Sequence, residues 1–96
     1  MSVKKVYLIG IGGIGMSALA RYYNHAGCIV AGYDRTESKL TQELAGEGIE
    51  IHYDDKVSSI PEIFRGSAND TLVIYTPAVP ADSDELGYFR ENGYEV

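Results

Sequence analysis

The chain has 96 residues, of which 45% are hydrophobic and 23% charged, a composition that fits one soluble globular domain. Its net charge of −6 argues against nucleic acid or an anionic membrane surface as a partner, because both select basic patches. The sequence has no apolar run long enough to span a bilayer or form a signal-peptide core, and its one cysteine forms no internal disulfide, so a cytoplasmic location is expected.

The first apolar run, Lys5–Ile9, predicts a strand buried on both faces, because it is nearly continuous in apolar residues rather than alternating. Ile14–His25 then repeats apolar residues at helical spacing, and Gly27 follows as a stop signal. A second continuous apolar run, Ile29–Tyr33, predicts another buried strand.

A second helix is expected at 37–45, introduced by Thr36 and ended by Gly46. The segment 49–53 alternates polar with apolar side chains, which is typical of a strand at the edge of a sheet. Residues 61–64 begin with a proline and predict no more than a short helical turn.

Thr71–Tyr75 is a third continuous apolar run and predicts a fourth strand. Asp82, with a glutamate three residues later, predicts the start of a helix at 83–92 that stops at Gly93. The last three residues, YEV, look like the start of a fifth strand, so we expect the chain to be a domain excised from a longer protein.

This alternation of strands and helices predicts an α/β fold, a Rossmann-like doubly wound parallel sheet of about five strands in the order 3-2-1-4-5. Residues 1–96 are expected to form one domain of this kind.

A glycine cluster separates the first strand from the first helix: Gly10, Gly12, Gly13 and Gly15. Three of them form a Gly-x-Gly-x-x-Gly motif in the first βα unit, the context in which this motif cradles a diphosphate. The first glycine is expected to permit a tight turn, the second to let a phosphate approach the backbone, and the third to let the helix pack closely on the strand. The amides and dipole of the helix would then hold the anion.

Asp34 ends the second strand nineteen residues after Gly15, where dinucleotide-binding proteins place the acid that holds a ribose diol. One interpretation is therefore an NAD-binding domain of an oxidoreductase or regulatory protein. Another is a ligand-free interaction domain that keeps the turn for packing. Asp34 itself has two further interpretations, as a solvated loop carboxylate or as a cap of the following helix.

Three blocks of sequence resemble the N-terminal domain of the UDP-N-acetylmuramate–L-alanine ligases of the Mur ligase family. GIGGIGMSALA, at 10–20, is similar to the nucleotide-sugar loop of that family, including Met-Ser-Ala after the last glycine. GYDRTES, at 32–38, and VIYTPAVPADSDEL, at 73–86, look like its second and fourth strand ends. The chain departs from the family pattern at His52-Tyr53, where Gly-His is usual, and at Tyr75-Thr76, where Ser-Ser is common.

The resemblance implies a three-domain cytoplasmic ligase of peptidoglycan precursor synthesis, whose N-terminal domain anchors the UDP moiety of UDP-N-acetylmuramate. The central domain would bind ATP and Mg²⁺, and the C-terminal domain would help to bind L-alanine. A GxxxxGK[ST] segment is absent from this sequence, so residues 1–96 alone are expected to hold no cofactor and to be inactive. The ligase that recycles murein tripeptide is the nearest alternative within the family.

The expected site has no catalytic residue and no metal ligand. The diphosphate-binding backbone is expected at Gly12, Gly13, Ile14, Gly15 and Met16, after the turn at Gly10. Ser17 would add a hydroxyl, and Asp34 and Thr36 would lie near the uridine ribose. The residues expected at the other wall and at strand ends are Thr76, Pro77, Ala78, Tyr75 and His52. Tyr75 and Tyr53 are candidates to stack on uracil, and His52 is expected to contact the ligand or to pack at its strand end.

Overall fold

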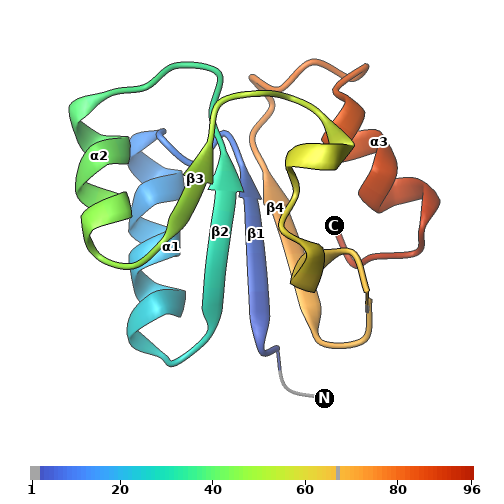
Figure 1. Cartoon of the computed structure of the whole chain (residues 1–96), viewed down its shortest axis with the longest axis horizontal. Helices are drawn as coiled ribbons and strands as arrows, with labels where there is room; N and C mark the ends of the chain where they lie inside the picture. The colour runs from blue at the N-terminus through green and yellow to red at the C-terminus, as the bar shows by residue number, and fades with distance from the viewer. Residues whose placement is uncertain (1–2, 67) are drawn as a thin grey trace.

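The computed structural model describes residues 3–66 and 68–96 and contains a parallel sheet of four strands in the order β3-β2-β1-β4. The strands are β1 (Lys5–Ile9), β2 (Ile29–Tyr33), β3 (Glu50–His52) and β4 (Thr71–Tyr75). All of them run in the same direction, so their carboxyl ends meet at one edge of the sheet, at the top of Figure 1.

Helices cover both faces of the sheet, which gives three layers (Figure 1). The helices α1 (Ile14–His25) and α2 (Lys39–Gly46) lie on one face. The other face is covered by α3 (Asp84–Glu91) and by two 3₁₀ turns, η1 (Val57–Ser59) and η2 (Glu62–Phe64). The predicted Rossmann-like α/β fold is therefore confirmed, and so is the placement of the third strand at an edge.

The strand order 3-2-1-4 is confirmed, and the place of a fifth strand beside β4 is taken by a single parallel bridge between Leu72 and Glu95. The amide of Val73 donates to the carbonyl of Glu95 at 2.9 Å in the same ladder. The final residues therefore extend the sheet at the position where the sequence predicted its continuation.

Three helix boundaries differ from the predictions. α2 begins at Lys39 with Ser38 as its cap, not with Thr36, because the Ser38 hydroxyl accepts from the Thr41 amide and Thr41 returns a bond to the Ser38 amide. Gly46 lies inside α2, and the chain turns at Gly48, whose φ is +96°. α3 is capped by Ser83 rather than Asp82, since the Ser83 hydroxyl accepts from the Leu86 amide.

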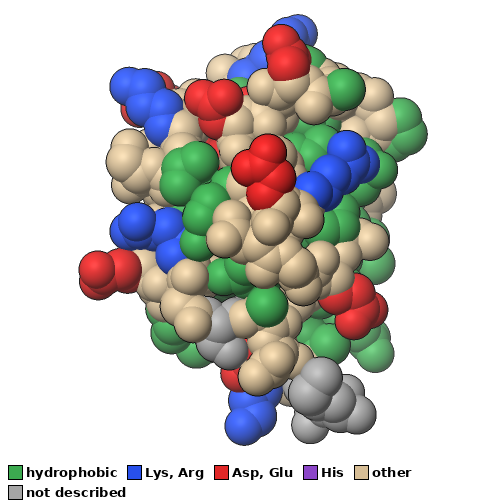
Figure 2. Space-filling model, turned by 90° about the vertical axis from the view of Figure 1, so that its right-hand side faces the viewer, with side chains coloured by type: hydrophobic (Ala, Val, Ile, Leu, Met, Phe, Trp, Pro, Cys, Tyr) green, Lys and Arg blue, Asp and Glu red, His purple; other side chains and the backbone are tan. Residues whose placement is uncertain are grey.

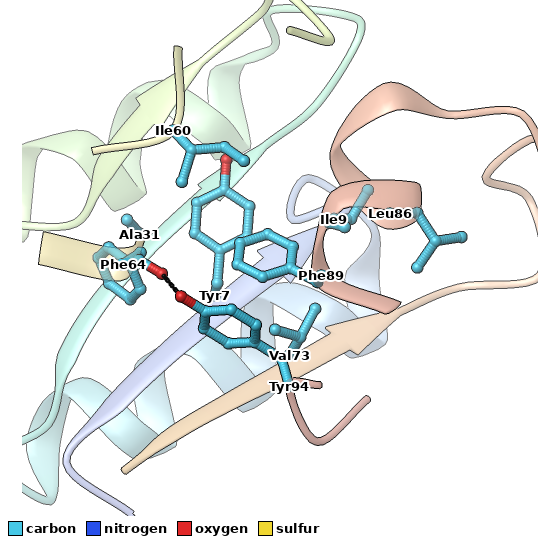
Figure 3. Packing of buried hydrophobic residues seen from close by; sticks show 9 residues of the cluster. All are labelled: Tyr7, Ile9, Ala31, Ile60, Phe64, Val73, Leu86, Phe89 and Tyr94. Atoms are coloured by element: carbon cyan, nitrogen blue, oxygen red, sulfur yellow. Dashed lines mark hydrogen bonds between the residues drawn. The ribbon is translucent and has the colours of Figure 1, made fainter. Parts of the chain in front are cut away.

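Aromatic rings fill the space between the sheet and α3. Tyr7 on β1 lies 5.1 Å from Phe89 and 5.4 Å from Phe64, measured between ring centroids. Figure 3 shows Tyr94 beside them, its hydroxyl donating to the carbonyl of Phe64 at 2.7 Å. This bond ties the chain end to η2, and packing of this kind fixes α3 against the sheet.

A carboxylate, Glu85 of α3, is fully buried in this layer. The hydroxyl of Tyr7 donates to Glu85 Oε1 at 2.6 Å, and His52 Nε2 lies 2.6 Å from Oε2. The Lys56 amide also donates to Oε2, at 3.3 Å, and Asp55 Oδ1 accepts from the Glu85 amide. Burial, and then the negative charge of Glu85, raise the pKa of Tyr7 far above its ordinary value. The phenol therefore stays protonated and remains a donor to the carboxylate.

The surface over α3 carries charges of both signs, which are scattered among apolar side chains and form no large patch of a single sign (Figure 2). Among the helices of the described residues, none has the length and apolar character needed to cross a membrane.

The Glu85 network predicts a large stability difference between two glutamates of the same helix. Glu85→Ala should lower the free energy of unfolding by about 3 kcal/mol, because Tyr7, His52 and the Lys56 amide lose a buried acceptor. Glu91→Ala, on the exposed surface of α3, should change it by no more than about 0.5 kcal/mol. Urea denaturation of the two variants measures this, and equal midpoints would show that the network contributes nothing.

Candidate functional site

Three loops meet at the carboxyl edge of the sheet and enclose a cavity of about 270 Å³. They are the glycine turn after β1, the segment after β2 and the segment after β4. The cavity is lined by Gly10, Gly13, Tyr33, Asp34, Arg35, Thr76, Ala78, Val79 and Pro80. Doubly wound sheets bind ligands at this edge, where neighbouring loops leave in opposite directions.

The glycine turn begins at a position that only glycine can occupy. Gly10 has a φ of +93°, and a β-carbon there would lie 2.5 Å from Thr76 Cγ2. The predicted role of the first glycine in a tight turn is confirmed, and the same residue brings the turn against the loop after β4.

Asp34 joins two of the three loops through its carboxylate. Oδ2 accepts from the Gly12 amide at 2.8 Å, and Oδ1 accepts from the Thr36 amide at 3.0 Å. A β-carbon at Gly12 would lie 2.8 Å from Asp34 Oδ2 and 2.9 Å from Thr41 Cγ2. The second glycine is therefore required by the packing of Asp34 and Thr41, and its amide is occupied within the protein, which differs from the predicted approach of a phosphate at this position.

Three consecutive amides at the start of α1 are available to a ligand. The Gly13 amide donates to the Gly10 carbonyl at 3.2 Å, and the Ser17 amide donates to the Gly13 carbonyl at 2.8 Å. Between them, Ile14, Gly15 and Met16 find no acceptor for their amides among residues 3–66 and 68–96. These N–H groups point out of the positive end of a helix dipole, an arrangement that suits an anion.

Gly15, in the middle of these three residues, has open space beside it. A β-carbon added there would meet no protein atom within 4 Å. The prediction that the third glycine lets the helix pack closely on the strand is therefore wrong for this chain. Because β-carbons tilt toward the N-terminus of a helix, this open space lies toward the N-terminal end of α1.

Of the predicted contacts, the structure brings Gly10, Gly13, Asp34, Thr76 and Ala78 to the cavity wall. The Ser17 hydroxyl does not face it, because this side chain is only 3% exposed and donates to the Ile14 carbonyl. Pro77 and the Thr36 side chain are not among the lining residues either, although the Thr36 amide holds Asp34.

Two strand-end residues of the predicted site take other roles in the structure. His52 belongs to the Glu85 network, so that strand-end packing is the role its contacts support. Tyr75 does not line the cavity, and its hydroxyl accepts from Arg90, whose guanidinium also lies 5.0 Å from the ring centroid. The ring is thus engaged by α3 rather than by the cavity.

Sequence reasoning missed four lining residues: Tyr33, Arg35, Val79 and Pro80. The position of Arg35 could have indicated that it lines the site, since it directly follows the strand-end acid Asp34. The sequence pattern identifies Tyr33 only as the last residue of a strand. Burial, followed by the negative charges of Asp55 and Glu85, raises the pKa of Tyr33, so its hydroxyl stays protonated.

The chain matches a family model described as "Mur ligase family, catalytic domain" over residues 5–96. It is similar to the UDP-N-acetylmuramate–L-alanine ligase of Porphyromonas gingivalis, with 57% identity over 94 residues that cover 98% of this chain and 20% of the relative. The ligase of the same name from Cytophaga hutchinsonii is 55% identical over 94 residues, with the same coverage of both chains. This chain thus spans about a fifth of the length of these curated relatives.

A solved structure gives the same result for the fold. The crystal structure of the UDP-N-acetylmuramate-alanine ligase of Thermotoga maritima superposes with a TM-score of 0.76 at 34% identity. The match covers 92% of this chain and 19% of that one.

Two glycines of the turn should respond in opposite ways to the same substitution. Gly12→Ala should destabilise the fold by about 1–3 kcal/mol, because its β-carbon displaces Asp34 or Thr41. Gly15→Ala should stabilise it by about 0.5 kcal/mol, because alanine favours the helix and meets no atom. Chemical denaturation of both variants tests this, and a loss of stability in Gly15→Ala would contradict the open space beside that residue.

Proposed function

The chain belongs to the Mur ligase family, and on this premise we propose that it anchors the UDP moiety of UDP-N-acetylmuramate for ligation to L-alanine. The observation that carries the proposal is the row of three available amides at Ile14, Gly15 and Met16, which directly follow the cavity-lining Gly13. A diphosphate needs several N–H donors at once, and a helix N-terminus supplies them together with a favourable dipole.

The names of the relatives support the choice of nucleotide. The Porphyromonas and Cytophaga proteins are UDP-N-acetylmuramate–L-alanine ligases, and this chain aligns with them along nearly its whole length. In this reading, the diphosphate lies against the first turn of α1 while the nucleoside enters the cavity between Asp34 and the loop after β4. The glycine turn then sets the distance between the two.

The chemistry of ligation is assigned to other parts of such an enzyme. Residues 1–96 contain no GxxxxGK[ST] segment, the loop that would hold the phosphates of ATP. We therefore place ATP, Mg²⁺ and the acyl transfer in the domains with which this one would work, and we expect these 96 residues alone neither to hydrolyse ATP nor to ligate an amino acid. Their part is to hold the substrate by its nucleotide.

The competing ligand is NAD, which the position of Asp34 favours. In dinucleotide-binding proteins an acid at this position accepts hydrogen bonds from the ribose diol. Here both carboxylate oxygens already accept a backbone amide, from Gly12 and from Thr36. The carboxylate thus has a task within the protein, and because UDP and NAD both carry a ribose diol, Asp34 does not decide between them. The choice of UDP rests on the names of the relatives.

Titration of the isotope-labelled domain with UDP, UDP-N-acetylmuramate and NAD tests the proposal. The two uridine nucleotides should shift the amide resonances of Ile14, Gly15 and Met16 at lower concentration than NAD does, with dissociation constants in the high-micromolar to millimolar range, about −4 to −6 kcal/mol. Gly15→Ala should weaken UDP binding about tenfold or more, because the methyl group occupies the space that the phosphate needs.

Gly87→Ala in α3 is the matched control. Its β-carbon also meets no atom within 4 Å, it lies within a helix, and it is not among the cavity-lining residues. This variant should gain similar stability and bind UDP like the wild type. Tighter binding of NAD than of UDP, or equal UDP affinity in Gly15→Ala and Gly87→Ala, would overturn the proposal.

A further inference from the structure

Arg35 contributes the one basic side chain among the described residues that line the cavity. It follows Asp34 at the end of β2 and is exposed. The structure gives its guanidinium no hydrogen bond and no ion pair within the described part of the chain. This sets it apart from Lys5, Arg21, Arg65 and Arg90, which are engaged with Asp70, with Glu43 and Glu47, with the Ile60 carbonyl and with Tyr75, respectively.

The neighbouring acid does not neutralise Arg35 by direct contact. The carboxylate of Asp34 is turned toward the glycine turn and the Thr36 amide, and no ion pair joins it to Arg35. Adjacent residues of opposite charge at the cavity therefore have different tasks. Asp34 holds loops together, and Arg35 is left available to a ligand.

We propose that Arg35 is the residue that selects a phosphorylated ligand in this cavity, by pairing its guanidinium with a phosphate oxygen of the diphosphate. This inference rests on the proposed function and assigns a residue to it. A diphosphate that enters a protein of net charge −6 meets an unfavourable overall field, and the three amides of α1 carry only partial charges. A guanidinium provides a full charge and a planar pair of donors that matches phosphate oxygens.

The charge of Arg35 also distinguishes the diphosphate from the nucleoside. Arg35 and Gly13 both line the cavity, and Gly13 directly precedes the three available amides. A phosphate held by those amides therefore lies next to a cavity whose lining includes Arg35. Uridine without phosphates presents no anion to Arg35, so its binding should not depend on the guanidinium.

The test compares Arg35→Ala, Arg35→Lys and Lys39→Ala for binding of UDP and of uridine, by amide shifts in an NMR titration. Lys39→Ala is the matched control, since it removes the same charge from an exposed residue that does not line the cavity. Arg35→Ala should weaken UDP binding about tenfold or more and change uridine binding less than twofold. Arg35→Lys should recover part of the loss, and Lys39→Ala should resemble the wild type.

The dependence of UDP affinity on NaCl concentration is a second measurement, and it would not change if the role of Arg35 were only structural. Added NaCl should weaken UDP binding to the wild type and to Lys39→Ala more than to Arg35→Ala, because the screened charge is already missing there. Equal UDP affinity in Arg35→Ala and Lys39→Ala, with UDP still bound by the wild type, overturns this inference and leaves the proposed function standing. A wild type that does not bind UDP but binds NADP through Arg35 overturns both, since Arg35 would then hold a ribose 2′-phosphate.

Discussion

The carboxylate of Asp34 is the contact on which the geometry of the site depends. Its two oxygens accept amides from Gly12 in the first loop and Thr36 in the second, so one side chain fixes the glycine turn against the exit of β2. With the Gly12 amide occupied, the next amides without a protein acceptor are those of Ile14, Gly15 and Met16. We therefore place the proposed anion site in the first turn of α1, where the helix dipole acts most strongly.

A second carboxylate, Glu85, organises the opposite face of the sheet. It lies fully buried at the start of α3, where Tyr7 of β1, His52 of β3 and the Lys56 amide contact it. Because α3 follows the loop after β4, these bonds hold the far wall of the cavity in place through the helix behind it. The two carboxylates act in different surroundings, one at the mouth of the site and the other in the core, yet each joins segments that are distant in the sequence.

The strands β1, β2 and β4 and the helix α1 could be predicted to the residue, because continuous apolar runs and helical spacing are local signals and tertiary packing agrees with them. The edge strand β3 is shorter than the predicted 49–53. The helix caps could not be predicted in this way. Ser38 competes with Thr36 as the cap of α2, and Ser83 competes with Asp82 as the cap of α3. Which residue caps each helix depends on how that helix docks on the sheet. The glycine motif indicated the site, but the role of Gly12 depends on Asp34 and Thr41, which approach it only in the folded chain. The open space beside Gly15 is likewise a property of the folded chain. His52 was ambiguous for the same reason, since its partner Glu85 lies 33 residues away.

Amide hydrogen exchange in the presence and absence of UDP tests the central claim most directly. In the free protein the amides of Ile14, Gly15 and Met16 should exchange fast, because no described residue accepts from them, whereas the Gly12 amide, bonded to Asp34, should exchange more slowly. Saturation with UDP should slow the exchange of all three and change that of Gly12 little. Unchanged exchange at Ile14, Gly15 and Met16 in the saturated protein would contradict the account, because the diphosphate would then lie elsewhere.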